Sequence, residues 1–250
     1  MILLQSSRKL SALKDILLQQ LPHSIMVYGA VAQIRHGNAC NLELLYFGSG
    51  FIILHPTVPY CKMCDNKLFS YYPYKAFPSS LFDAIQEERE KIDHMVDPSL
   101  MLILHDPQSL PDVRTDVAPR ISSLRVTHAD IVNQSVKYGG SEHSLHYIKT
   151  CIQNLPSCCI LDDNGSPISW ALLDESCAIR MGFTFPEYRR VGYMKVVLAT
   201  LARKVHMMGF PVHLRVEENN TAALRACKSM GFTLYPDLYL MFKLIPSSLP

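Results

Sequence analysis

The order of elements expected in residues 157–244 constrains the fold of this 250-residue chain more than any other feature. Over residues 193–208, apolar side chains recur every three to four positions, which predicts an amphipathic helix. Asn164-Gly165 predicts a hairpin turn, and Asn220 is a suitable cap for a second helix. The expected strands are 158–161, 168–173, 178–185, 212–216 and 232–244. Three antiparallel strands followed by helix, strand, helix and strand predict an α+β, or mixed α/β, domain.

The chain upstream of this region gives weaker patterns. The expected helices are 10–21, 81–95, 127–139 and 141–154, and the expected strands are 24–34 and 42–46. Residues 97–119 are rich in proline and aspartate, a composition that is typical of a connector. We therefore divide the chain into an N-terminal half, residues 1–119, and a C-terminal half, residues 120–250.

The composition excludes several classes of protein. With 48% apolar and 18% charged residues the chain can bury a core, so it is not expected to be disordered. A net charge of +2 argues against bulk electrostatic binding of nucleic acid. No apolar run reaches the ~18–20 residues of a transmembrane helix, and no secretory pattern is evident, so we expect the eight cysteines to be thiols. Residues 6–21 fit either a weak mitochondrial presequence or an ordinary N-terminal helix.

Two other kinds of site were considered for the cysteines. Cys61 and Cys64 form one CxxC pair, but no second pair lies at the spacing that a closed zinc site needs, so no metal is expected. Cys151 lies near His143 and His146, which is the weak beginning of a Cys–His hydrolase hypothesis. The hydrolase hypothesis also needs a base that the sequence cannot locate.

The turn between the third strand and the helix 193–208 carries the strongest chemical signal. A helix N-terminus presents unpaired N–H groups and a partial positive charge, which together suit a phosphate. Gly192 allows the backbone to approach such a ligand closely, and Arg189 and Arg190 add positive charge. The alternative is a surface turn with two solvated arginines.

The spacing of this turn resembles that of the GNAT superfamily of acyl-CoA N-acyltransferases. Arg189-x-x-Gly192 follows a strand, and Asn220-x-x-Ala follows one strand and one helix downstream. The resemblance implies that two neighbouring parallel strands splay apart at a bulge to hold the pantetheine arm, and that the turn holds the pyrophosphate. The cofactor-binding residues that it implies are Phe185, Arg189, Arg190, Val191, Gly192, Tyr193, Met194 and Asn220. Met194 departs from the small residue usual at its position.

Ordered blocks along most of the chain are similar to the glycine N-acyltransferase family. These blocks are 21–41, 126–133, 138–142, 151–153, 156–159, 169–170 and 185–190. The family joins acyl-CoA thioesters to the amine of glycine or of another amino acid such as glutamine. The resemblance implies a GNAT fold, with a degenerate GNAT-like N-terminal half and a catalytic C-terminal half. Residues 47–80 do not resemble the family.

The same resemblance implies the ligands and the setting. Acyl-CoA, or coenzyme A, is the expected co-substrate, and no metal is expected. The expected partners are small-molecule substrates and not nucleic acid, and the protein is expected to be a monomer. The expected location is mitochondrial, with the endoplasmic reticulum or the cytoplasm as alternatives.

The catalytic base is the main departure from the family. Family members use a glutamate on the strand before the turn, and alignment on the Pro-Glu-Tyr-Arg block places Ala178 there. Glu175 is a weak substitute, and Cys227 occupies the position where many GNAT enzymes have a tyrosine acid. The catalytic residues are therefore unknown. A non-catalytic acyl-CoA-binding protein is the main alternative to an enzyme, and a scaffold without a ligand is the third possibility.

Overall fold

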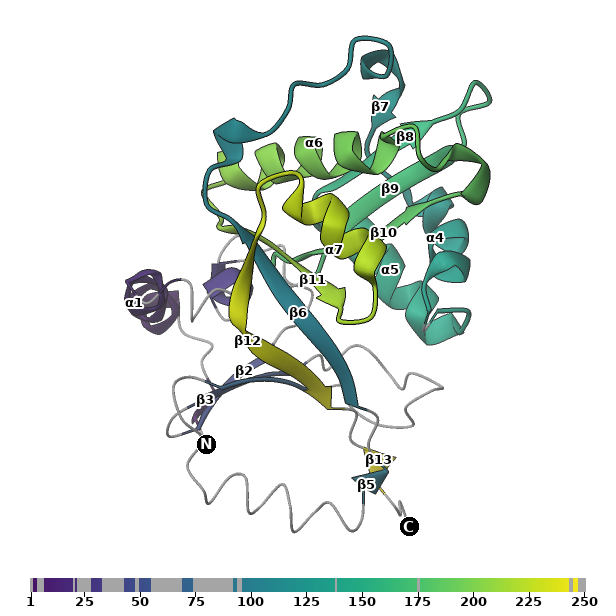
Figure 1. The fold of residues 1–250 in the computed structure, drawn as a ribbon. Coiled ribbons are helices and arrows are strands. Elements are labelled where there is room, and N and C mark those ends of the chain that lie inside the picture. The colour runs from purple at the N-terminus through teal and green to yellow at the C-terminus, as the bar shows by residue number, and fades with distance from the viewer. Residues whose placement is uncertain are drawn as a thin grey trace. The chain divides into compact units, whose positions relative to one another are not determined.

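The computed structural model divides the chain into two compact units, residues 1–98 with 240–250 and residues 99–239 (Figure 1). It describes residues 2–3, 7–19, 21, 28–32, 43–47, 50–54, 69–73, 92–93, 96–137, 139–174, 176–242 and 245–246. The boundaries fall between residues 98 and 99 and between residues 239 and 240, whereas the sequence predicted a division after residue 119. The assignment of a separate role to each half stays a prediction.

The first unit contains a small antiparallel sheet in the order β1-β2-β3-β4. Its elements are β1 (Ile2–Leu3), α1 (Ser7–Leu18), β2 (Glu43–Phe47), β3 (Gly50–Leu54), β4 (Phe69–Pro73), β5 (Ile92–Asp93) and β13 (Ile245–Pro246). The predictions of a helix near 10–21 and a strand near 42–46 are confirmed. Of the helix predicted at 81–95, residues 81–91 lie outside the described residues, and 92–93 form β5.

The strand predicted at 24–34 is wrong where the structure describes it, because residues 28–32 are helical. Tyr28, Ala30, Val31 and Ala32 are all buried there. Tyrosine and valine favour strands only weakly, and such preferences depend on the surroundings. Alanine has the highest helix propensity of all residues. This propensity and the burial of the segment together outweigh the strand preference of tyrosine and valine.

The second unit is built on a seven-stranded sheet in the order β12-β6-β11-β10-β9-β8-β7. The strands are β6 (Val96–Leu104), β7 (Ile121–Ser122), β8 (Ser157–Leu161), β9 (Pro167–Leu173), β10 (Ile179–Thr184), β11 (Val212–Glu217) and β12 (Thr233–Phe242). The helices are α4 (Ala129–Ser135), α5 (Glu142–Asn154), α6 (Tyr193–Met207) and α7 (Thr221–Lys228), with short 3-10 turns at Pro107–Ser109, Ala118–Arg120, Val126–His128 and Pro186–Tyr188. The mixed α/β class predicted from the sequence is confirmed.

Strand β6 corrects the prediction of a connector at 97–119. It pairs antiparallel with β11 along six residues, from Ser99 opposite Glu217 to Leu104 opposite Val212. The segment Leu100-Met-Leu-Ile-Leu104 is a short apolar run, and such runs are typical of fully buried strands. The flanking prolines and aspartates led to the prediction of a loop, because these residues are typical of loops.

Helix boundaries in the second unit follow the local signals closely. Ser141 caps α5, with its hydroxyl accepting a hydrogen bond from the Ser144 N–H at 3.1 Å. Gly209 adopts a φ of 77° just after α6, as a helix-ending left-handed residue does. The helix predicted at 127–139 is shorter, because a 3-10 turn precedes α4 and the helix ends at Ser135.

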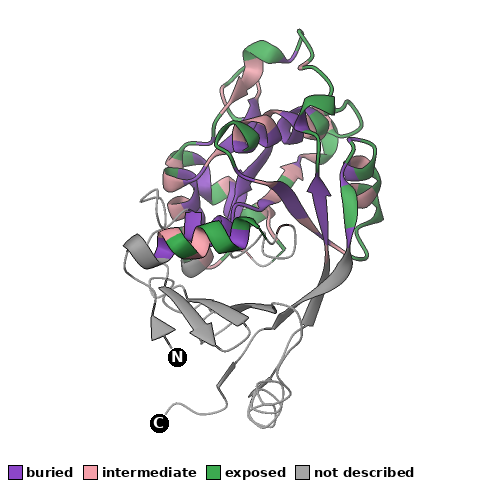
Figure 2. Cartoon of the chain, turned by 90° about the vertical axis from the view of Figure 1, so that its left-hand side faces the viewer, coloured by how far each residue is buried: buried purple, intermediate pink, exposed green. Residues whose placement is uncertain are grey.

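The core of the second unit lies along this sheet. Helix α6 packs against β8, β9 and β10, and α5 packs against α4 and β9. Figure 2 shows the buried residues gathered on the strands and on the inner sides of the helices. Trp170 on β9 is fully buried, and its ring lies 5.1 Å from that of Phe183 and 5.7 Å from that of Phe185. These aromatic contacts hold β9 and the end of β10 together.

Candidate active site

The sheet opens between β10 and β11, which are neighbouring parallel strands. Ile179 is paired with Leu214, and no later pair joins these two strands in the part of the chain that the structure describes. Strand β10 nevertheless continues to Thr184, and β11 continues to Glu217 in full register with β6. The two strands therefore part toward their C-terminal ends, as the splayed pair predicted from the sequence requires.

A β-bulge lies on β10 beside this opening. Arg180 is paired with Leu172, and Phe183 with Trp170, so two residues of β10 face one residue of β9. One of the two, Met181, has a φ of 53°, which is rare for a residue with a side chain. The bulge thus bends β10 where the sheet opens.

The side chain of Met194 points back toward the bulge. A Cβ atom built on Gly182, the second residue of the bulge, would lie 3.5 Å from the Met194 sulfur. The methionine therefore lies against β10. Although residue 194 is not the usual small residue, α6 still begins where the GNAT pattern requires.

The turn that follows β10 has an unusual backbone. Arg190 and Gly192 both have positive φ, at 67° and 91°, and Gly192 is the residue that caps α6. The first N–H groups of a helix have no partner within the helix, so these groups are available at Tyr193 and Met194. A strained residue such as Arg190 persists only where its surroundings require it, and such residues cluster at ligand sites.

Arg189 supports the turn from within. Its Nε donates a hydrogen bond to the Thr184 carbonyl at 2.9 Å, and its guanidinium lies 5.8 Å from the centre of the Phe183 ring. This side chain therefore ties the turn to the end of β10. Arg190 and Val191 are exposed.

Two further arginines reach the turn and the first residue of α6, and neither was predicted from the sequence. Arg114 donates a hydrogen bond to the Val191 carbonyl at 2.5 Å, and Arg120 donates one to the Tyr193 hydroxyl at 3.0 Å. Asp116 forms an ion pair with Arg114, and the hydrogen bond between these two side chains lowers the pKa of the Asp116 carboxyl. Neither arginine could be assigned from sequence, because each lies more than 70 residues from its partner.

Asn220 forms the helix cap that its sequence context predicted. Its Oδ1 accepts a hydrogen bond from the Ala223 N–H at 3.1 Å, and it begins α7. The residue is exposed. Its role toward a cofactor stays a prediction.

The position that the sequence alignment assigned to the family base holds no titratable side chain. Ala178 is fully buried immediately before β10. Its N–H donates to Oδ1 of Asp174 at 3.1 Å, and its carbonyl accepts from the Asp174 N–H at 3.0 Å. Glu175, the weak substitute, lies outside the described residues. Burial raises the pKa of the Cys227 thiol on α7 to about 11, so this group stays protonated at neutral pH.

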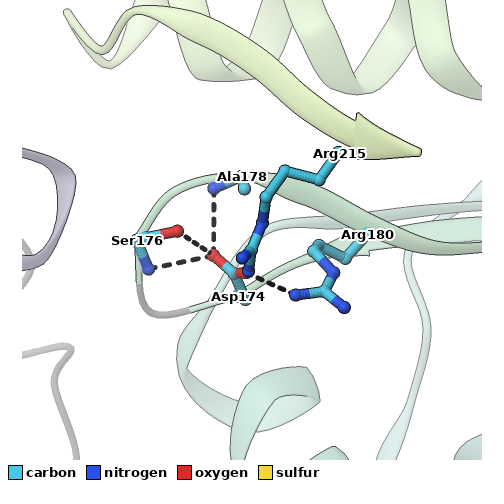
Figure 3. Close-up of polar contacts among 5 residues, drawn as sticks. All are labelled: Asp174, Ser176, Ala178, Arg180 and Arg215. Atoms are coloured by element: carbon cyan, nitrogen blue, oxygen red, sulfur yellow. Dashed lines mark hydrogen bonds and ion pairs between the residues drawn. The ribbon is translucent and has the colours of Figure 1, made fainter. Parts of the chain in front are cut away.

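Asp174 is the centre of a buried polar cluster at this end of β10 (Figure 3). Its Oδ1 accepts hydrogen bonds from the Ser176 N–H at 2.9 Å and the Ser176 hydroxyl at 2.6 Å, besides the one from Ala178. Its Oδ2 lies 3.2 Å from Nη2 of Arg215 and 3.6 Å from Nη1 of Arg180. Because both oxygens are engaged, this carboxylate shapes the loop and is a poor candidate for a base.

His213 lies beside the base position on the neighbouring strand. The pairing of Ile179 with Leu214 places residue 178 next to residue 213 across the parallel pair. The imidazole is buried, and burial lowers its pKa to about 4, although nearby Asp174 acts in the opposite direction. Its Nδ1 lies 3.3 Å from the Pro211 carbonyl. It is therefore neutral throughout the physiological range.

The structure gives little to the other hypotheses. Cys61 and Cys64 lie outside the described residues. Within the described ranges, no three His, Cys, Asp or Glu side chains gather as a metal site. Cys151 is buried in α5, whereas His146 on the same helix is exposed. The described helices include none that is both long and apolar enough to cross a membrane.

Solved structures with the same arrangement define the class of the fold. The chain is similar to the X-ray structure of a Drosophila protein, with a TM-score of 0.75, 14% identity and coverage of 98% of both chains. It is also similar to a GCN5-related N-acetyltransferase-like protein from Streptococcus suis, with a TM-score of 0.55, 12% identity and coverage of 96% of this chain and all of that one. The fold is therefore the GNAT fold of acyltransferases.

Sequence comparison then identifies the family. The model of the aralkyl acyl-CoA:amino acid N-acyltransferases matches residues 1–46 and 78–156, and that of their C-terminal region matches 158–246. Human glycine N-acyltransferase is 29% identical, over 94% of both chains, and human glycine N-acyltransferase-like protein 1 is 29% identical, over 93% of both. The chain belongs to the aralkyl acyl-CoA:amino acid N-acyltransferase family and is an acyltransferase.

Proposed function

We propose that this protein transfers an acyl group from acyl-CoA to the amine of glycine, or of another amino acid such as glutamine, by direct attack in a ternary complex. The observation that carries the proposal is the splayed pair β10 and β11, with the turn 189–192 following β10 at the N-terminus of α6. The chain's family supplies the reaction class. The strands hold the pantetheine arm, and the turn holds the pyrophosphate.

The residues of the turn fit coenzyme A in charge and in shape. The free N–H groups at the start of α6 suit phosphate oxygens, and Gly192 leaves the space that a side chain would fill. Arg190 is exposed and adds a cation, whereas Arg189 is held by Thr184 and shapes the turn. We assign cofactor binding to Phe185, Arg189, Arg190, Val191, Gly192, Tyr193, Met194 and Asn220. No metal is part of the proposal.

The transfer itself is a nucleophilic substitution at the thioester carbonyl. The lone pair of the amine forms the C–N bond, the C–S bond breaks, and coenzyme A leaves as a thiol once it has taken up a proton. The amine must lose a proton, and a positioned base typically accelerates such a step by 10²–10⁴-fold. Since Ala178 offers no base, we propose that solvent removes the proton and that the rate rises with pH.

A second candidate function is acyl-CoA binding without catalysis. Ala178 favours it, because a methyl group cannot accept a proton, and the protonated Cys227 thiol is a poor acid. Both candidates retain the cofactor turn. They differ only in whether an amine consumes the bound acyl-CoA.

For the setting we propose a mitochondrial monomer that acts on small molecules and does not bind nucleic acid. The support is the family resemblance together with the basic segment 6–21. The endoplasmic reticulum and the cytoplasm are the alternatives. Imaging of the full chain with a C-terminal fluorescent tag would distinguish them.

Thiol release from acyl-CoA tests the two candidates directly. Purified protein is mixed with benzoyl-CoA, with or without glycine or glutamine, between pH 7 and 9. Release that requires the amine and rises with pH supports the enzyme. If release does not depend on the amine while coenzyme A still raises the melting temperature, the protein is a binder.

The variant Arg190→Ala/Gly192→Trp tests the site itself. We expect it to lose the stabilisation by coenzyme A, because a side chain at Gly192 is strained and fills the phosphate position. Gly209→Trp is the matched control, since Gly209 has the same left-handed backbone at the other end of α6. Equal activity of the double variant and the wild type would show that the site assignment is wrong.

A further inference from the structure

The connector between β6 and β7, residues 105–120, is tied to α6 at two places. Arg203 on α6 donates hydrogen bonds to the carbonyls of residues 110–111 at 2.8 and 3.0 Å. Arg120 donates one to the hydroxyl of the first residue of α6 at 3.0 Å. Figure 1 shows the connector running beside this helix. Arg114 lies between the two attachments and is thereby brought to the N-terminus of α6.

The guanidinium of Arg114 lies beside the space that Gly192 leaves open. Its Nη1 donates a hydrogen bond to the Val191 carbonyl at 2.5 Å. A Cβ atom built on Gly192 would lie 3.6 Å from the same nitrogen. This nitrogen carries two N–H groups, and the Val191 carbonyl takes one of them. The other N–H group is therefore available to a ligand that fills the space beside Gly192.

Asp116 fixes the orientation of this guanidinium. Nε of Arg114 donates a hydrogen bond to Oδ1 of Asp116 at 3.1 Å, and Nη2 donates one to Oδ2 at 2.5 Å. The bidentate pair occupies the Nε–Nη2 edge of the guanidinium, so Nη1 is left for the turn. The same hydrogen bonding raises the pKa of the Arg114 guanidinium, which keeps its charge at any physiological pH. Because the Arg114 side chain is 47% exposed, a ligand can reach it from solvent.

The chemistry of these groups suits a phosphate. Arginine is the preferred partner of phosphate oxygens, because its planar N–H groups make charge-assisted hydrogen bonds to them. The turn 189–192 supplies the exposed Arg190 and the free N–H groups at the start of α6. Arg114 adds a second cation from a segment more than 70 residues away. A pyrophosphate carries a negative charge on each of its phosphates, so it can use both arginines.

We propose that Arg114 binds the pyrophosphate of coenzyme A beside Gly192, with Asp116 orienting its guanidinium. This inference rests on the proposed function, because it needs coenzyme A at the turn 189–192. One N–H group of Nη1 holds the turn through the Val191 carbonyl, and the other contacts the ligand. Arg114 is a binding residue, since it takes no part in the transfer of the acyl group or of a proton.

The experiment measures the binding of coenzyme A and of dephospho-coenzyme A, which has the pyrophosphate but no 3′-phosphate, by calorimetry. We expect Arg114→Gln to weaken the binding of both ligands roughly 10-fold, as the loss of a charged hydrogen bond does. Arg114→Lys keeps the charge without the bidentate pair and should fall between the variant and the wild type. If Arg114→Gln weakens only coenzyme A, then Arg114 contacts the 3′-phosphate and the inference is wrong.

Arg203→Gln is the matched control. Arg203 ties the same connector to α6, but at residues 110–112, where it also forms an ion pair with Asp112 at 3.9 Å. We expect this variant to bind coenzyme A as the wild type does. If it weakens binding as much as Arg114→Gln, loosening of the connector explains the loss and the inference is overturned.

Salt dependence separates a phosphate contact from support of the turn alone. Salt screens exposed charges, so the affinity of the wild type for coenzyme A should fall as salt is added. Arg114→Gln has one contact with the ligand charge fewer, and its affinity should fall less steeply. Equal slopes in the two proteins would show that Arg114 only supports the turn, which would overturn the inference.

Kinetics separate failure of the inference from failure of the function. If the wild type acylates an amine, Arg114→Gln should raise the KM for benzoyl-CoA roughly 10-fold and leave kcat unchanged. An unchanged KM and unchanged binding of coenzyme A in Arg114→Gln would overturn the inference while the proposed function stands. If the wild type neither binds coenzyme A nor releases its thiol, both the inference and the proposed function are wrong.

Discussion

The two ends of β10 differ in how far they keep the pattern of the family. At its C-terminal end, the turn 189–192 retains the arginine, the glycine and the free helix N-terminus that suit a pyrophosphate. At its N-terminal end, the loop 174–178 has an alanine where the family has its base. In the proposed function, the first end binds the pyrophosphate of coenzyme A and the second end is where the family base would remove a proton, so the two tasks lie at opposite ends of one strand.

The described part of the loop at the N-terminal end, residues 174 and 176–178, nevertheless forms several polar contacts. Asp174 fixes it through hydrogen bonds to Ser176 and Ala178 and through the two arginines. The comparison teaches that, in the proposed function, cofactor binding and proton transfer depend on separate groups, so each of them is open to a separate test.

The largest expected effect comes from restoring the base. Ala178→Glu places a carboxylate at the position that the sequence alignment assigned to the family base. We expect the amine-dependent rate to rise 10²–10⁴-fold, the typical contribution of a general base. Ala178→Gln is the control of equal size without a basic atom. If both variants fold, bind coenzyme A and match the wild-type rate, then proton transfer is not the step that limits this protein.

The next effect concerns stability at the same end of β10. Asp174→Asn removes the charge that pairs with two guanidiniums, and breaking a buried pair in this way costs about 3–5 kcal/mol. Asp116→Asn, in the exposed ion pair beside the cofactor turn, should leave the melting temperature almost unchanged. Denaturant unfolding measures both. A small loss in Asp174→Asn would show that the cluster is more hydrated than its burial indicates.

The smallest expected effect is a pH dependence of stability. His213 has a folded-state pKa of about 4, whereas the unfolded histidine has about 6.5, so only the unfolded state takes up this proton between the two values. The free energy of unfolding should therefore keep its full value above pH 6.5 and fall by about 3 kcal/mol as the pH drops to 4. His213→Leu should remove this slope, and His146→Leu, on the exposed part of α5, should keep it. A slope that survives in His213→Leu would assign it to other groups.

The local structure of the second unit could be predicted from the sequence. Caps such as Ser141 and Asn220, the left-handed Gly209 and the periodicity of α6 act over a few residues, so the sequence contains the whole cause. The turn 189–192 was found for the same reason. The strand β6 was missed, because periodicity alone cannot distinguish a short apolar run in a buried strand from one in a buried helix, and the flanking prolines and aspartates favoured a loop.

By itself, the amino-acid sequence determined the class of the fold, the family and the alanine at the base position. Only the tertiary structure decided that β6 lies between β11 and β12, that Arg114 reaches Val191 and that Arg120 reaches Tyr193. It also brought Arg180 and Arg215 to the buried Asp174. The physical reason is that these pairings depend on strand order and burial, which join residues far apart in the chain, whereas caps and turns depend on neighbours in sequence.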